Sequence, residues 1–181
     1  MALEHPVMDL MSDHRRIEAV MSALEKQLLA GDSFPAEFIG KALTFFVEYA
    51  DGFHHLKEEE YLFPAMADRG VPVECGPIGV MLHDHAIGRQ LLSGIRSRLE
   101  EASRGDPNAQ TAVRVYATQY IDMLRQHIWK EDNVLFSIAQ RVLDEQAADS
   151  VAEEFATMSS TNGAAETLER HRQFADAASR L

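Results

Sequence analysis

The feature that most constrains this chain is a pattern of histidines and acidic residues that occurs twice in the same order. Each half begins with an Asp-His pair, at Asp13-His14 and at Asp84-His85. In each half a second segment follows at nearly the same separation and reads His-x-x-Lys-Glu-acid-x-x-Leu-Phe. These segments are His54–Phe63 and His127–Phe136. One such half could arise by chance, but two in the same order indicate a function that both halves share.

Helical periodicity runs along the whole chain, and no stretch alternates for long enough to favour a strand. Prolines and glycines predict four long helices, over about residues 6–30, 34–70, 77–105 and 107–143. Pro35 is expected in the first turn of the second helix, and Asp106 is expected to cap the fourth. Farther on, Ser150 to Glu153 is typical of a capping box for a short helix, and residues 164–180 predict a final helix.

Helix lengths place both halves of the repeat at one level. At about 1.5 Å per residue, the path from His14 to the first turn covers roughly 24 Å, and the path back to His54 covers roughly 28 Å. The same sum for His85 and His127 gives about 30 Å in each direction. The sequence therefore predicts an all-α, up-down-up-down four-helix bundle over residues 1–144, with residues 145–181 as a C-terminal helical extension packed on it.

The predicted layer has the composition of a dinuclear metal site. A histidine and a glutamate four residues apart share one helical face, and a carboxylate can bridge two ions while imidazole binds iron, zinc or copper. Hydrogen bonds alone would satisfy so many buried polar groups poorly, which favours a metal over a structural polar layer and leaves zinc open beside iron. The candidate metal ligands are His14, His54, Glu58, His85, His127 and Glu131.

Helical spacing assigns the neighbouring polar residues to other faces. His55 is about 100° around the helix from His54, and His83 about 200° from His85, so both are expected to point away from the layer. Asp13 and Asp84 could orient a ligand histidine, but solvation is favoured. Solvated surface is also expected for His5, Lys57, Glu59, Glu60, Lys130, Asp132 and His171, whereas packing positions are expected for Trp129 and for Tyr49, Tyr61, Tyr116 and Tyr120.

Charge and cysteine content exclude several classes of function. The chain has 29 acidic and 17 basic residues and a formal net charge of −12, which repels nucleic acid and anionic membrane surfaces. Its single cysteine, Cys75, cannot form an internal disulfide. The first residues lack the pattern of a signal peptide, and no segment predicts a transmembrane helix, so a cytoplasmic location is expected.

The two halves together resemble the hemerythrin-like, or HHE cation-binding, family, and in particular its bacterial di-iron branch, which includes proteins that repair nitrosatively damaged iron centres. The segments His54–Pro64, Gly76–Arg89 and His127–Phe136 carry this resemblance. It implies two iron ions, one bound by His14 and His54 and the other by His85 and His127. Glu58 and Glu131 would bridge them, together with an oxo or hydroxo group. Oxygen-carrying relatives have a further histidine one turn before the third-helix ligand, where this chain has Met81.

The resemblance implies a site that binds or reacts with a small diatomic ligand, O2 or NO, or with peroxide. As an enzyme, the protein would be a di-iron oxidoreductase that reduces peroxide or nitric oxide with electrons from a redox partner that the sequence does not identify. Alternatives are an O2 or NO sensor or carrier without turnover, and an iron donor for the repair of iron centres. A metal-stabilised bundle that serves as a partner surface is the least favoured reading.

Overall fold

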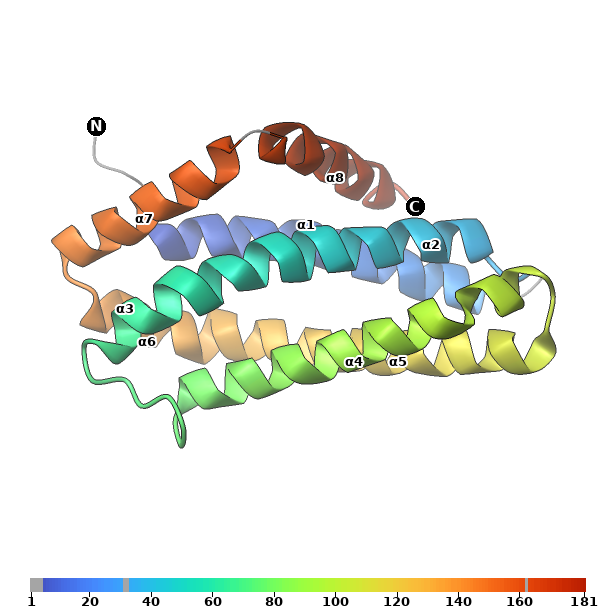
Figure 1. Cartoon of the computed structure of the whole chain (residues 1–181), viewed down its shortest axis with the longest axis horizontal. Coiled ribbons are helices and arrows are strands. Elements are labelled where there is room, and N and C mark those ends of the chain that lie inside the picture. The colour runs from blue at the N-terminus through green and yellow to red at the C-terminus, as the bar shows by residue number, and fades with distance from the viewer. Residues whose placement is uncertain (1–4, 31–32, 162) are drawn as a thin grey trace.

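A computed structural model describes residues 5–30, 33–161 and 163–181, and every regular element in these ranges is a helix. The helices form long rods that run alternately in opposite directions along the bundle (Figure 1), which confirms the predicted all-α bundle. The first and third rods are single helices, α1 (Pro6–Leu29) and α4 (Pro77–Ser103). The second rod consists of α2 (Ala36–Phe45), the π-helical segments η1 (Phe46–His55) and η2 (Glu58–Leu62), and α3 (Phe63–Ala67). The fourth rod consists of α5 (Pro107–Lys130), the π-helical segment η3 (Glu131–Leu135) and α6 (Phe136–Val142).

The predicted helix starts are correct where a proline follows a side-chain cap. Asp106 accepts a hydrogen bond from the backbone N–H of Ala109 at 2.7 Å, immediately before Pro107 at the start of α5. Pro35, by contrast, lies just before α2 and not in its first turn. In the described residues every one of the four rods thus begins within two residues of its expected position, because these signals act locally.

The predicted capping box at Ser150 is wrong, because α7 (Glu145–Ser160) begins earlier. Leu143 adopts an extended backbone conformation that ends α6, and the side chain of Asp144 accepts the backbone N–H of Ala147 at 2.9 Å. Ser150 therefore lies inside α7. The last helix, α8 (Ala164–Ala178), follows Gly163, whose φ of 85° lies in the left-handed region that glycine adopts most readily.

Helices α7 and α8 lie along the outside of the bundle, against α1, as Figure 1 shows. Their buried side chains, such as Phe155 on α7 and Leu168 on α8, join the apolar clusters of the bundle. The division of the chain into residues 1–144 and 145–181 stays a prediction. None of the helices in the described ranges combines the length and hydropathy that crossing a membrane requires.

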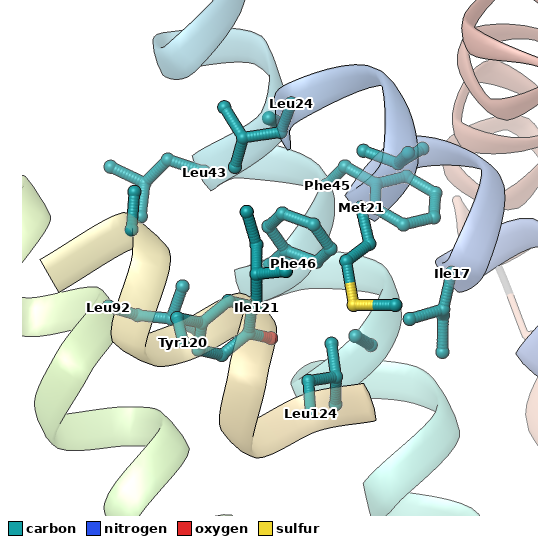
Figure 2. Close-up of a cluster of buried hydrophobic side chains, with 14 of the residues drawn as sticks. Ile17, Met21, Leu24, Leu43, Phe45, Phe46, Leu92, Tyr120, Ile121 and Leu124 are labelled. Carbon is teal, nitrogen blue, oxygen red and sulfur yellow. The ribbon is translucent and has the colours of Figure 1, made fainter. Parts of the chain in front are cut away.

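Two apolar clusters fill the bundle, one on each side of a polar layer. The larger cluster includes Ile17 and Met21 of α1 and Phe46, Ile121 and Leu124 of the facing helices, whose side chains converge in Figure 2. The other cluster includes Leu10, Leu62, Met81 and Phe136. Burial of each such side chain stabilises the fold by about 1.5–3 kcal/mol, so the apolar ends can offset the cost of a polar middle.

Both motif helices widen into a π turn where the motif glutamate lies. The carbonyl of Glu58 accepts the backbone N–H of Phe63, and the carbonyl of Glu131 accepts that of Phe136, so each bond spans five residues instead of four. Such turns are rare in helices and occur often at functional sites. The repeat in the sequence is therefore also a repeat in backbone conformation.

Candidate metal centre

The structure brings all six predicted ligands into one layer between the apolar clusters. They come from four different rods of the bundle, since α1 and α4 each supply one histidine and each motif helix supplies a histidine and a glutamate. None of their side chains is more than 1% exposed. The six residues are His14, His54, Glu58, His85, His127 and Glu131. The helix lengths estimated from the sequence therefore predict correctly that these residues lie at one level of the bundle.

Their ligand atoms form two adjacent groups. In the first cluster, one ligand atom from each of His14, His54, Glu58 and Glu131 lies within 4.8 Å of the others. The second cluster, defined in the same way, consists of His55, Glu58, His85 and His127. Glu58 belongs to both clusters, which makes the layer one site with two halves.

Each glutamate reaches one histidine of each cluster. An oxygen of Glu58 lies 3.8 Å from Nε2 of His54 and 3.5 Å from Nε2 of His85. An oxygen of Glu131 lies 3.1 Å from Nε2 of His14 and 3.2 Å from Nε2 of His127. A carboxylate between two groups of imidazole nitrogens is the arrangement that a bridging ligand requires.

Many polar atoms at the centre of the layer have no hydrogen-bond partner among the described residues. They include both carboxylate oxygens of Glu58 and Glu131, and Nε2 of His85 and of His127. Buried polar atoms in native proteins are nearly always paired, because leaving one unpaired costs about 1–3 kcal/mol. Nitrogen and carboxylate atoms that converge in this way fit a bound cation and fit a purely structural hydrogen-bonded layer poorly.

Two of the ligand histidines are held from behind by a carboxylate of the other half of the repeat. Nδ1 of His14 donates to Asp132 at 2.7 Å, and Nδ1 of His85 donates to Glu59 at 2.6 Å. A carboxylate on the outer nitrogen fixes the ring and leaves Nε2 free to bind a metal. Asp132 and Glu59 are predicted to be solvated, but both instead contact predicted ligands, His14 and His85.

The other two ligand histidines have an aspartate of their own half behind them. Nδ1 of His54 lies 3.7 Å from Asp13, and Nδ1 of His127 lies 3.5 Å from Asp84. The preference for solvation of these aspartates is therefore wrong, since Asp13 is 1% exposed and Asp84 is 9% exposed. Each aspartate faces a histidine of the neighbouring helix and not the one adjacent to it in sequence, which is why spacing along one helix could not reveal its partner.

Lys57 is also buried, which contradicts its predicted place on the surface. Its ammonium group donates to Asp13 at 2.8 Å and to Asp9 at 2.6 Å, and the side chain is 1% exposed. The hydroxyl of Tyr49 donates to the other oxygen of Asp13 at 2.6 Å. Burial acts to raise the pKa of the Asp13 carboxyl. His54 and Lys57 outweigh burial, hold that pKa well below its usual range and keep Asp13 ionised.

The carboxylates also control the protonation of two predicted ligands, His14 and His85. Burial acts to lower the pKa of His14, but the hydrogen bond to Asp132 and the adjacent carboxylate of Glu131 outweigh it and raise that pKa to about 10. Burial likewise acts to lower the pKa of His85, whose two carboxylate neighbours raise it to about 9. In the metal-free protein these imidazoles therefore hold protons at neutral pH, and a cation must displace them.

The two glutamates differ in their affinity for protons. Burial and repulsion by Glu131 raise the pKa of Glu58. Burial opposes ionisation of Glu131 as well, but the adjacent His127 and His14 hold its pKa well below the usual range. Two carboxylates that share one buried site cannot ionise independently, so a cation between them would remove the repulsion.

His55 is the clearest departure from the sequence prediction. It was expected to point away from the layer, yet its side chain is buried, with 5% exposed, and its ring belongs to the second cluster. The angular step of an ideal α-helix separates His55 from His54 but does not by itself define which helical face His55 shares. His55 also lies three residues before Glu58, a spacing that shares a helical face, and the π-helical segment η1 changes the angular step.

Several other predicted positions can be compared with the structure. His83 is exposed as expected. His171 is buried, with 3% exposed, and its Nε2 lies 2.9 Å from Glu48, so its predicted surface position is wrong. Trp129 is 61% exposed on α5, so its predicted packing position is wrong.

A helical bundle that buries converging histidines and glutamates between apolar clusters defines a class of cation-binding proteins. The sequence profile of the hemerythrin HHE cation-binding domain matches residues 5–139, and the chain belongs to this family. The resemblance drawn from the two motif halves is thereby confirmed, and the site is one that binds a cation, with iron as the metal that the family implies.

The relatives with functional names are repair proteins. The chain is 32% identical over 130 residues to the iron–sulfur cluster repair protein DnrN of Neisseria gonorrhoeae, a match that covers 70% of this chain and 79% of that protein. It is 40% identical over 92 residues to the iron–sulfur cluster repair protein YtfE of Dickeya chrysanthemi, over 49% of this chain and 41% of that protein. These similarities support the bacterial branch that the motifs indicated.

A longer but weaker match extends over most of the chain. An uncharacterized protein of Mycobacterium tuberculosis is 27% identical over 174 residues, which is 93% of this chain and 62% of the relative. The chain therefore spans about three fifths of the length of this mycobacterial relative. No solved structure was found to match the chain.

Proposed function

We propose that the layer holds two iron ions. His14 and His54 would bind one ion, His85 and His127 would bind the other, and Glu58 and Glu131 would bridge the pair. The observation that carries this proposal is the position of each glutamate, which contacts a histidine of both clusters. A carboxylate between two groups of histidines can hold two cations close together, whereas a site for one cation would not require a carboxylate in this position.

The chain supplies charge balance and orientation to this pair. With metal bound, the ligand set would contain four neutral imidazoles and two carboxylates. An aspartate or glutamate lies behind each of the four imidazoles. The apolar clusters above and below exclude water, which strengthens the electrostatic interactions within the layer. Side-chain packing and outer hydrogen bonds therefore fix the ligands before a metal binds.

We further propose that the site binds or reacts with O2, NO or peroxide. When bound, an iron pair with few protein nitrogens offers open coordination positions and a redox change that two ions share. As an enzyme the protein would reduce peroxide or nitric oxide with a redox partner that is not yet identified. A carrier or sensor of the same ligands would use the same site without turnover.

A second candidate function is repair of iron–sulfur centres by iron donation. The observation that favours it is the similarity to the repair proteins DnrN, over 130 residues, and YtfE, over 92 residues. Iron that a purified apo iron–sulfur protein acquires from this chain, at a rate above that from free ferrous iron, would support this role. Transfer no faster than from free ferrous iron would exclude it.

Anaerobic loading with ferrous iron tests the principal proposal. We expect two irons per chain and a visible spectrum that changes when O2, NO or peroxide is added. Repeated consumption of an oxidant in the presence of a reductant indicates an enzyme, and a reversible stoichiometric change indicates a carrier or sensor. Protein that retains one zinc and cannot take up two irons would contradict the dinuclear assignment.

Substitution of the glutamates tests the ligand assignment. Glu58→Ala and Glu131→Ala should each reduce iron content from two ions per chain to one or none, because each removes a shared carboxylate. His83→Ala is the matched control, since His83 is an exposed histidine on α4, two residues before His85. Equal losses of iron in all three variants would show that the assignment is wrong.

A further inference from the structure

His55 faces the second cluster although the sequence repeat gives it no counterpart. Its ring stacks on that of His85, with centroids 3.8 Å apart and planes 13° apart, and its centroid lies 5.4 Å from that of His127. Its Nε2 is buried and has no hydrogen-bond partner among the described residues. One ring nitrogen of His55 lies with ligand atoms of Glu58, His85 and His127 in a set of atoms within 4.8 Å of one another.

The outer nitrogen of His55 is held in the same way as that of His85. Nδ1 of His55 lies 3.2 Å from a carboxylate oxygen of Asp51. Arg89 donates to Asp51 and to Glu59, at 2.8 Å in each case, and so joins the carboxylates behind the two stacked rings. A carboxylate that accepts the Nδ1 proton leaves the lone pair on Nε2, which is the form of histidine that binds a metal.

We propose that His55 is a fifth nitrogen ligand of the metal centre. The second cluster would then hold its ion through three imidazoles, from His55, His85 and His127, and the first cluster through two. This inference rests on the dinuclear site proposed above. The third nitrogen would come from the second rod of the bundle, through the residue directly after a predicted ligand.

The repeat itself shows why this site is not symmetric. The residue after His54 is His55, whereas the residue after His127 is Ile128, an apolar side chain that is 3% exposed in the larger apolar cluster. The first cluster therefore has no imidazole at the corresponding place. An exogenous ligand should bind the ion held by His14 and His54, because fewer protein nitrogens occupy its coordination positions.

Mössbauer spectroscopy of protein loaded with ⁵⁷Fe tests this asymmetry. The native protein should bind two irons per chain in two different environments, seen as two quadrupole doublets of equal area. His55→Ile copies the residue of the other half, and this variant should keep two irons while the environments become alike. Ile128→Val is the control, because it alters the corresponding position without changing a nitrogen, and its spectrum should match that of the native protein.

Imidazole in solution provides a second test that does not depend on the folding of His55→Ile. His55→Gly creates space for a free imidazole, which should restore the native doublets if the lost group binds iron. An unaltered spectrum on addition of imidazole would overturn the inference. So would a folded His55→Ile protein with the native spectrum, and in both cases two bound irons would leave the dinuclear proposal intact. Native protein that binds fewer than two irons would instead refute the proposed function.

Discussion

At the scale of single residues, two lysines in corresponding positions of the repeat have different environments. Lys57 is enclosed by Asp9, Asp13 and the rings of Phe53 and Phe155, which lie 4.1 and 5.3 Å from its ammonium group. Lys130 donates to Asp84, but its side chain is 34% exposed. The buried Lys57 stabilises the charge of Asp13, which lies behind the predicted ligand His54, whereas water can replace much of the stabilisation that Lys130 gives to Asp84.

Substitution of these lysines should therefore have unequal effects on stability. Lys57→Met leaves Asp13 as a buried charge with a weakened partner set and should lower the free energy of unfolding by about 3 kcal/mol. Lys130→Met should lower it by less than about 1 kcal/mol. Urea denaturation of the two iron-loaded variants, with iron content measured in parallel, compares them directly. Similar losses in both would mean that burial does not distinguish the two lysines.

At the scale of elements, α4 and α5 carry His85 and His127 of the second cluster and pack closely against each other. Gly94 of α4 faces Tyr116 of α5 so closely that an added Cβ would lie 2.9 Å from three ring atoms. That distance is shorter than side chains tolerate, and one of the ring atoms is the one nearest the backbone. Glycine is therefore needed here for the approach of the two helices, not for an unusual φ.

Two glycine substitutions should separate helix propensity from helix packing. Gly94→Ala should lower the free energy of unfolding by about 1–3 kcal/mol, because overpacking outweighs the better helix propensity of alanine. Gly40→Ala in α2 should raise it by about 0.5–1 kcal/mol, because the nearest side-chain atom, on Leu99, would lie at an ordinary 3.8 Å. Chemical denaturation of both variants tests this, and stabilisation by Gly94→Ala would show that α4 and α5 can move apart freely.

At the scale of the whole molecule, stability should depend on the protons that the polar layer holds. In the metal-free protein the pKa of His14 is raised to about 10 and that of His85 to about 9, above their unfolded value of about 6.5. Groups whose pKa is raised on folding stabilise the protein fully below the unfolded pKa. That stabilisation is lost as the pH rises through the folded pKa.

We therefore expect the free energy of unfolding of the metal-free protein to fall as the pH rises from about 7 to about 10. Iron-loaded protein is the control, because metal binding replaces these protons and should reduce the dependence on pH. Urea denaturation of both forms at constant ionic strength measures the effect. A metal-free protein that becomes more stable across this range would contradict the assigned protonation of the layer.

The sequence alone determined the fold and the six-residue candidate site. Helical periodicity, prolines and capping residues are local signals, and they predicted four rods whose ends agree with the structure to within a few residues. The repeat then identified His14, His54 and Glu58 with their three counterparts, since equal rod lengths bring equivalent positions to one level. One helix start, at Asp144, was missed because Ser150 offered a competing capping pattern.

Only the tertiary structure decided what surrounds those six residues. Periodicity gives the direction of a side chain about its own helix axis, but packing determines which neighbouring helix lies in that direction. Asp13 and Lys57 meet across two helices, so neither could be assigned from its own helix. The π turn at Glu58 also changes the angular step on which such predictions depend. His55 thus enters the metal centre through a combination of backbone conformation and packing that a helical projection of the sequence does not contain.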